Sequence, residues 1–214
     1  MRPELRGDGT RRRRSSERLL GWLLIAAGAG LLSQAVAARA RGIVWQVTHR
    51  RALEATGHPV GAFRPSGLAR PAVPIAQPVA GEAVARLRIA RMGLDAVVIE
   101  GVGGESLALG PGHLSGSALP GQPENCVIAG HRDGAFLRLG SVKIGDVVDV
   151  QDARGLARYR VFSIEVLDGG DTRPLAPAGR PILTLVTCYP MHSIGPASER
   201  LVVRGELVPP AATT

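Results

Sequence analysis

The 214-residue chain contains few aromatic residues, few cysteines and almost no lysine. Aromatic residues make up 3% of it, so any core must be built from the abundant aliphatic side chains. Two cysteines, Cys126 and Cys188, are too few for a disulfide-rich scaffold, and no C-x-x-C pair offers metal or redox chemistry. Lys143 is the one lysine among 26 basic residues, which we attribute to the base composition of the coding DNA. We expect neither a metal nor a cofactor.

The positive charge is unevenly distributed along the chain. The formal net charge is +8 at pH 7, with about +4 in residues 1–18, about +7 in residues 39–91 and about −3 in residues 92–214. The segment with the pattern of a folded domain is therefore slightly acidic. Because nucleic-acid binding requires a basic face on the folded part, we expect no nucleic-acid partner.

Residues 19–38, LLGWLLIAAGAGLLSQAVAA, form an uncharged apolar run that is long enough to cross roughly 30 Å of hydrocarbon. Small residues near its end also fit a cleaved signal peptide, but the run is longer than a typical signal core. We therefore predict an uncleaved transmembrane anchor in contact with membrane lipid. The arginines at 11–14 favour a cytoplasmic N-terminus (residues 1–18) and an extracytoplasmic domain after the anchor, although Arg39, Arg41, Arg50 and Arg51 reduce the asymmetry.

Residues 39–83 are predicted to connect the anchor to the domain. Their first part, RGIVWQVTHRRALEA, could extend the helix past the bilayer, with Trp45 near the interface. The second part, from about Gly57 to Gly81, carries prolines at 59, 65, 71, 74 and 78. Prolines at this spacing prevent a helix and favour an extended, semi-rigid spacer.

From Val84 onward the pattern changes to short apolar or alternating runs separated by Gly, Pro and Asp, which is typical of β-strands. The runs are 85–91, 95–100, 125–130, 146–151, 156–167, 182–187 and 200–208. Regular short strands with turn signals between them favour a closed or nearly closed barrel. Short helices are expected only near Ser106 and Phe136.

Two residues with nucleophile and base chemistry each come directly after a predicted strand. Cys188 ends the run PILTLVTC, where a thiol is held on a rigid element and stays accessible to a substrate. His131 follows NCVIAG, where an imidazole can exchange protons near neutral pH. Either residue alone could be structural, since many cysteines are small buried hydrophobes. His113, in a Pro/Gly-rich turn, and His192, in an exposed segment, are weaker candidates for the base.

Arg200 opens the last predicted strand, RLVVRGELV. An acyl-transfer site needs a cation or oriented N–H groups where the tetrahedral oxygen develops charge. An arginine at a strand end supplies a rigid fork of donors that stays charged. Arg204 lies on the same face by the strand period of two, so spacing does not separate the two arginines.

Three motifs in this chain resemble those of the sortase family. TLVTC (184–188) is similar to the family's cysteine signature, AGHRD (129–133) to its histidine motif and SERLVVRGEL (198–207) to its arginine strand, in the family's order. The intervening segments resemble the class D group, including its Gram-negative variants. The resemblance covers residues 84–208.

The resemblance implies an all-β fold, an eight-stranded β-barrel with short helices, after an N-terminal transmembrane helix and before a tail of residues 209–214. It implies a cysteine transpeptidase in which Cys188 attacks an LPxTG-like C-terminal sorting signal of a secreted protein and forms a thioacyl enzyme. His131 would protonate the leaving amine and deprotonate the amine acceptor. The family position selects Arg200 over Arg204 as the residue that orients the signal and stabilises the oxyanion.

Three other functions compete with this reading. A membrane-anchored cysteine endopeptidase would use the same residues with water as the acceptor. A cysteine L,D-transpeptidase would have its histidine and cysteine close together around a Ser-x-Gly-Cys segment, which differs from the pattern around Cys188. A binding barrel without enzymatic activity would not require a thiol, a histidine and an arginine at three strand ends.

The second cysteine raises the question of a disulfide. Cys126 lies five residues before His131, or about 17 Å along an extended strand, so it should lie beyond bridging distance of Cys188. We therefore expect a buried, inert Cys126 and two free thiols. Asp133 could orient a charged partner, but we expect it to cap a short helix around Phe136.

Overall fold

The computed structural model describes residues 9–55, 77–193 and 195–209. Most of the predicted Pro-rich spacer, the first eight residues and the end of the predicted tail lie outside the described residues. The elements are α1 (Gly9–Ala55), β1 (Ala83–Ile89), η1 (Ala90–Met92), β2 (Leu94–Glu100), α2 (Gly104–Leu109), β3 (Gly112–His113), β4 (Asn125–Ala129), η2 (Leu139–Ser141), β5 (Val147–Asp152), β6 (Gly155–Asp168), η3 (Arg173–Leu175), β7 (Ile182–Tyr189) and β8 (Glu199–Leu207).

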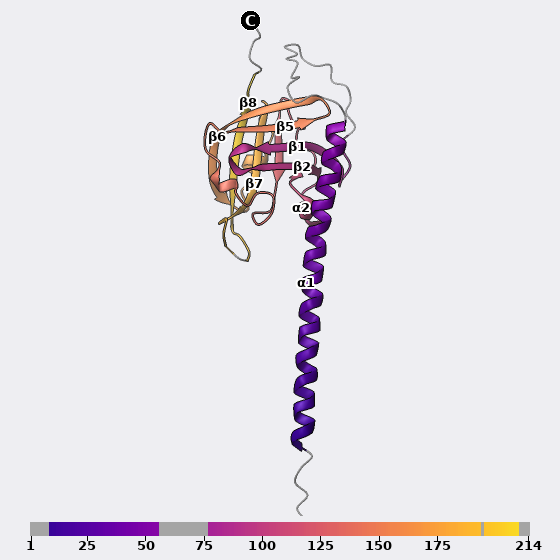
Figure 1. Ribbon diagram of the computed structural model, residues 1–214. Helices are drawn as coiled ribbons and strands as arrows, with labels where there is room; N and C mark the ends of the chain where they lie inside the picture. The colour runs from indigo at the N-terminus through magenta and orange to yellow at the C-terminus, as the bar shows by residue number, and fades with distance from the viewer. Residues whose placement is uncertain (1–8, 56–76, 194, 210–214) are drawn as a thin grey trace, which may run out of the picture. The chain divides into compact units, whose positions relative to one another are not determined.

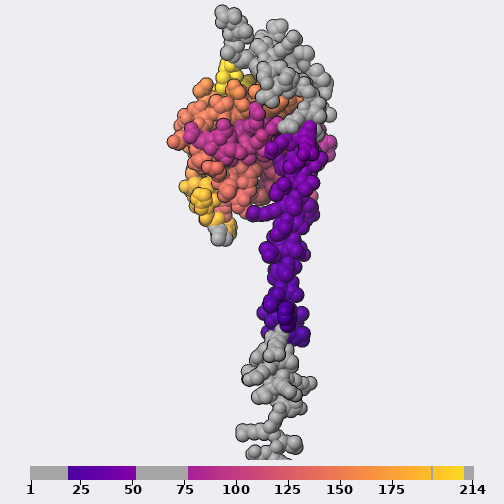
Figure 2. All heavy atoms as spheres, in the orientation of Figure 1, coloured from indigo at the N-terminus to yellow at the C-terminus, as the bar shows by residue number. Residues whose placement is uncertain are grey.

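The chain divides into two compact units, Met1–Arg41 and Gly42–Thr214. In the first unit, the described residues all belong to α1, drawn in indigo in Figure 2. Their large apolar side chains are exposed, among them Trp22 and Leu31 at 70% each. The helix is long and apolar enough to cross a membrane between Leu19 and Arg51. An apolar surface of this extent requires an apolar environment, which agrees with a membrane anchor or a signal segment.

The second unit is built on a closed barrel of eight strands in the order β1-β2-β3-β4-β7-β8-β6-β5 (Figure 1). The ring closes where β1 pairs with β5 in antiparallel fashion. Two neighbouring pairs are parallel, β2 with β3 and β4 with β7. The predicted all-β barrel is confirmed, and closure protects the sheet edges except along the first part of β2, where the two-residue strand β3 does not reach.

The barrel interior is filled by alternate residues of the strands, as the two-residue period requires. Phe136 and Tyr159 are the largest side chains in it and are fully buried. The remaining strand residues of this core are small or aliphatic: Ala85, Leu87, Ile89, Val98, Cys126, Ile128, Val148, Val150, Ala157, Val161, Leu183, Leu185, Leu201 and Val203. This composition is the consequence of the low aromatic content of the chain.

Side-chain hydrogen bonds hold the segment between β3 and β4 against the barrel. His113 Nδ1 lies 2.6 Å from Glu100 Oε2, and its Nε2 donates to the Ala118 carbonyl at 3.0 Å. The Tyr159 hydroxyl accepts the Gly121 N–H at 2.7 Å, and Arg154 donates to the Pro120 carbonyl at 2.9 Å. Pairing of the buried polar atoms in this way avoids the cost of leaving them unsatisfied.

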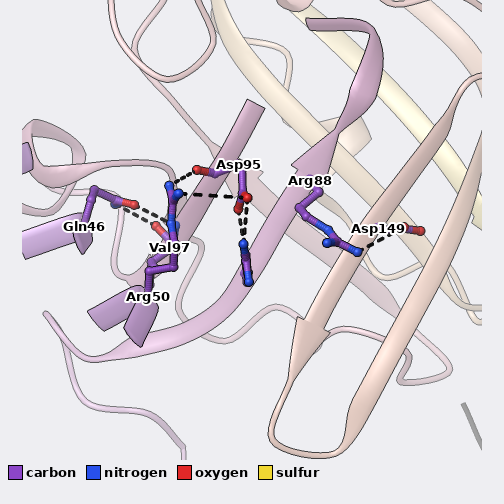
Figure 3. A network of polar contacts seen from close by, with 7 residues as sticks. Gln46, Arg50, Arg88, Asp95, Val97 and Asp149 are labelled. Atoms are coloured by element: carbon purple, nitrogen blue, oxygen red, sulfur yellow. Dashed lines mark hydrogen bonds and ion pairs between the residues drawn. The ribbon is translucent and has the colours of Figure 1, made fainter. Parts of the chain in front are cut away.

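The last turns of α1, which belong to the second unit, pack against β2 and α2 through one face of the helix. Gly42, Gln46 and Arg50 follow the i, i+4, i+8 spacing that places residues on one face. Gln46 accepts the Val97 N–H at 2.7 Å and donates to the Val97 carbonyl at 3.0 Å (Figure 3). Arg50 donates to the backbone carbonyl of Asp95. Gln46 thus bonds both the N–H and the carbonyl of Val97, the two groups that a neighbouring strand would bond.

Candidate active site

Cys188 on β7 and Arg200 on β8 lie opposite each other, and His131 comes two residues after the end of the neighbouring strand β4. Strands β4 and β7 are parallel, with Ala129 opposite Val186, and the Gly130 N–H continues the ladder by donating to the Val186 carbonyl at 3.1 Å. His131 is the next residue after Gly130, just beyond the end of β4. On the other side of β7, Cys188 is the direct cross-strand partner of Arg200. Opposite residues of an antiparallel pair have Cα atoms about 4.5–5.5 Å apart.

The side chains of Cys188 and Arg200 share the outer face of the barrel. Leu185 on β7 and Leu201 on β8 point into the core, so their neighbours Cys188 and Arg200 alternate to the opposite face. His131 is exposed and Cys188 is half-buried. The thiol is therefore held at the end of a buried strand and is accessible from solvent, as the sequence predicts.

Backbone and side-chain contacts fix the two strand ends against each other. The buried Thr187 hydroxyl donates to the Gly130 carbonyl at 2.8 Å, so the residues just before Cys188 and His131 are tied together. Gly130 packs so closely on Phe136 that a Cβ would lie 2.7 Å from the ring. The His131 carbonyl accepts N–H groups from both Gly134 and Phe136, each at 3.1 Å. These contacts define where the His131 backbone lies.

The structure separates the two arginines that sequence spacing leaves equivalent. Arg204 lies opposite Thr184, with its guanidinium carbon 5.6 Å from the centre of the Phe162 ring. Arg200 lies opposite Cys188, and its Nη1 donates to the carbonyls of Ala197 at 3.0 Å and Glu199 at 2.8 Å. Since a guanidinium has five N–H donors, Arg200 retains donors for a further acceptor next to the thiol.

Cys126 lies on the opposite side of the barrel wall from the thiol of Cys188. It is buried in the core at 1% exposure, opposite Leu183 of β7, and both cysteines are free. Burial is the main cause that raises the pKa of the Cys126 thiol. The expectation that Cys126 is buried is confirmed, and its high pKa opposes reaction as a thiolate.

The other candidate bases, His113 and His192, differ in their surroundings. His113 is 1% exposed on the short strand β3 and is paired with Glu100, so it is not available to Cys188. His192 is exposed, as expected. The predicted cap at Asp133 is wrong, because residues 132–138 form consecutive turns and no helix begins there. Instead, the close packing of Gly130 on the Phe136 ring fixes this segment.

Comparison with known proteins agrees with the geometry. The fold and the site define a barrel-type cysteine transpeptidase, and the sortase domain family matches residues 87–208. The chain belongs to the sortase family. Among curated proteins it is similar to sortase D of Bacillus subtilis, with 29% identity over 133 residues, which are 62% of this chain and 67% of the relative.

Solved structures of sortases have the same fold. A Clostridium perfringens sortase D5 transpeptidase is 26% identical and matches with a TM-score of 0.56 over 61% of this chain and 81% of its own. Sortase C-1 from Actinomyces oris is 34% identical, with a TM-score of 0.56 over 59% of this chain and 74% of its own. The chain is therefore a sortase-family cysteine transpeptidase with an eight-stranded barrel and a long apolar N-terminal helix.

Proposed function

We propose that this transpeptidase cleaves an LPxTG-like C-terminal sorting signal of a secreted protein and transfers the acyl part to an amine acceptor. The observation that carries the proposal is that Cys188 and Arg200 are direct cross-strand partners, with His131 just beyond the end of the neighbouring strand β4. A nucleophile, a proton carrier and an oxyanion donor are the groups that acyl transfer through a thioester requires.

In the first step, the proton of the Cys188 thiol passes to His131, and the sulfur bonds to the carbonyl carbon of the scissile peptide bond. The carbon–nitrogen bond breaks as the tetrahedral intermediate collapses, and His131 gives a proton to the leaving amine. The product is a thioester between Cys188 and the acyl segment of the signal. Both residues stand at strand ends that Thr187 ties together through the Gly130 carbonyl, which holds the geometry that the step needs.

In the second step, the acceptor amine attacks the thioester carbon and the carbon–sulfur bond breaks. His131 removes the proton from the amine, and Cys188 is restored to its starting state. The new bond is an amide, so the reaction needs no oxidant or energy source. Arg200 donates to the oxyanion in both steps and orients the signal beside the thiol, to which its direct cross-strand position is suited.

We further propose the organisation that the sequence favours. Residues 1–18 lie in the cytoplasm, residues 19–38 cross the membrane without being cleaved, residues 39–83 connect to the domain, residues 84–208 form the catalytic domain and residues 209–214 are a tail. The exposed apolar face of α1 between Leu19 and Val36 supports the membrane span. The catalytic domain then acts on secreted proteins outside the cytoplasm.

The test is a ligation assay with the full-length protein in detergent micelles. A peptide series of the form Leu-Pro-X-Thr-Gly with a fluorescent N-terminus is incubated with triglycine, and the products are identified by mass spectrometry. We expect a ligated product and a trapped acyl adduct on Cys188, both absent in Cys188→Ala. Product hydrolysed by water even at high triglycine would establish an endopeptidase, and ligation by Cys188→Ala would refute the mechanism.

A further inference from the structure

The outer face of β7 is partly exposed to solvent near Cys188 and is covered four residues earlier. Cys188 and Val186 are partly exposed, whereas Thr184 on the same face is fully buried. Thr184 is covered by the connection between β6 and β7, residues 169–181, because Pro174 of that connection lies over it, with its carbonyl 3.5 Å from the Thr184 hydroxyl. The open strip beside Cys188 therefore ends at a wall formed by this connection, about 13 Å from the thiol-bearing residue along an extended strand.

Asn125, the first residue of β4, binds the wall with both polar atoms of its side-chain amide, Nδ2 and Oδ1. Its Nδ2 donates to the carbonyls of Pro174 at 2.9 Å and Ala176 at 3.0 Å. Its Oδ1 accepts the Thr184 hydroxyl at 2.7 Å. The Asn125 side chain is 2% exposed, so these bonds are shielded from water, and an unmade bond would leave a buried polar group without a partner.

Glu124, the residue before it, binds the same connection farther along. Its Oε2 accepts the N–H groups of Ala178 at 2.8 Å and Gly179 at 2.9 Å. These backbone hydrogen bonds lower the pKa of the Glu124 carboxyl, so the carboxylate is charged at neutral pH and its bonds are charge-assisted. Two adjacent residues thus bind four backbone groups within residues 174–179.

We infer that Glu124 and Asn125 are positioning residues that set how the enzyme binds the peptide segment preceding the scissile bond. The inference rests on the proposed function. The acyl segment remains bound through both steps, whereas the leaving amine and the acceptor exchange on the other side of the reacting carbon. The strip of β7 that leads from Cys188 to the wall at Pro174 is the floor for the acyl segment, and the wall limits what side chains fit there.

If Glu124 and Asn125 act by holding the wall, replacing them should have an effect that a general loss of stability would not have. Loosening of the wall should weaken binding of the peptide and leave binding of the amine unchanged. Two neutral hydrogen bonds to a buried amide correspond to roughly a ten-fold effect, so Asn125→Asp should raise KM for the peptide about ten-fold. In that variant an oxygen replaces Nδ2 and faces the two carbonyls of Pro174 and Ala176.

The experiment uses full-length protein with the Leu-Pro-X-Thr-Gly peptide and triglycine as separate varied substrates. Glu124→Ala and Asn125→Asp are compared with Glu124→Gln, which retains a side-chain oxygen for the two N–H groups. Arg158→Ala is the control, because Arg158 lies on β6 outside this connection, is 53% exposed and pairs with Asp149. Hydrogen–deuterium exchange at the amides of Ala178 and Gly179 reads the contact directly, without substrate.

We expect faster exchange at both amides and a higher peptide KM in Glu124→Ala, with the KM for triglycine within two-fold of the unaltered protein. Arg158→Ala should retain the unaltered values, and Glu124→Gln should change them less than Glu124→Ala, because glutamine keeps an oxygen acceptor but loses the charge. Unchanged exchange in Glu124→Ala, or an equal rise of KM for peptide and triglycine, would overturn the inference. Absence of any acyl adduct in the unaltered protein would instead refute the proposed function, and the exchange measurement would still report whether the two residues hold the connection.

Discussion

Replacing Gln46 by leucine tests how firmly the end of α1 is joined to the barrel. In the structure, β3 pairs with β2 only at Ile99 and Glu100, so the preceding β2 residues lack a strand on that side. Gln46 takes that place at Val97, with one bond accepted and one donated, and also donates to the Leu109 carbonyl at 3.1 Å. Leucine has a similar volume but can form none of these bonds.

The expected loss can be worked from these contacts. Val97 is buried at 0% exposure, and a buried N–H without a partner destabilises by about 1–3 kcal/mol. The carbonyls keep lone pairs that are less costly to leave unpaired. A loss of about 2–3 kcal/mol in the free energy of unfolding corresponds to a decrease in Tm of roughly 5–15 °C for a domain of this size.

Two further variants make the test specific. Gly110→Ala should have a similar effect, since a Cβ there would lie 2.2 Å from Gln46 Nε2 and displace the amide. Thr48→Ala is the control on the same helix, because Thr48 is exposed and bonds only the Val44 carbonyl of its own helix at 2.9 Å. Tm is measured in detergent, and hydrogen exchange at the Val97 amide identifies the bond. If exchange at Val97 is the same in Gln46→Leu and the unaltered protein, the helix end is not joined to β2 as described.

Further predictions concern the thiols, the arginines, the topology and the response to acid. A thiol reagent should modify Cys188 in preference to the buried Cys126, and Cys126→Val should retain activity, whereas a disulfide between them in active protein would contradict the site. Arg200→Ala should reduce turnover about 10²–10³-fold and Arg204→Ala far less, and equal losses would show that the wrong arginine was chosen. Protease added to spheroplasts should remove the domain after residue 39 and spare the arginine-rich terminus, so protection of the domain would reverse the proposed topology. The hydrogen bond from Arg86, and more weakly the charges of nearby arginines, lowers the pKa of Asp95. Its stabilising effect should therefore be complete above its ordinary pKa of about 3.9 and be lost as pH falls through the lowered value. Urea midpoints against pH should show this loss in the unaltered protein and not in Asp95→Asn.

The local pattern of apolar and turn-forming residues was sufficient to predict most helices and strands of the fold. The run at 182–187 is β7 (Ile182–Tyr189), the run at 125–130 is β4 (Asn125–Ala129) and the predicted helix near Ser106 is α2 (Gly104–Leu109). Such runs are visible in sequence because burial of one face imposes a period on neighbouring residues. The two-residue strand β3 was not predicted, since a pair of residues has no period and pairs only because β2 and β4 lie on either side.

The sequence by itself determined the family and the candidate residues, because AGHRD, TLVTC and SERLVVRGEL are short segments that can each be recognised without the fold. Spacing left Arg200 and Arg204 equivalent and the family resemblance selected Arg200, but only the register between β7 and β8 places Arg200 opposite Cys188. The ties from Asn125 to Pro174 and from Gln46 to Val97 were likewise decided by tertiary structure, since each joins residues about 50 positions apart. A side-chain amide has no preferred partner in the sequence, and its hydrogen bonds are fixed only when packing brings unpaired backbone groups within reach and excludes water.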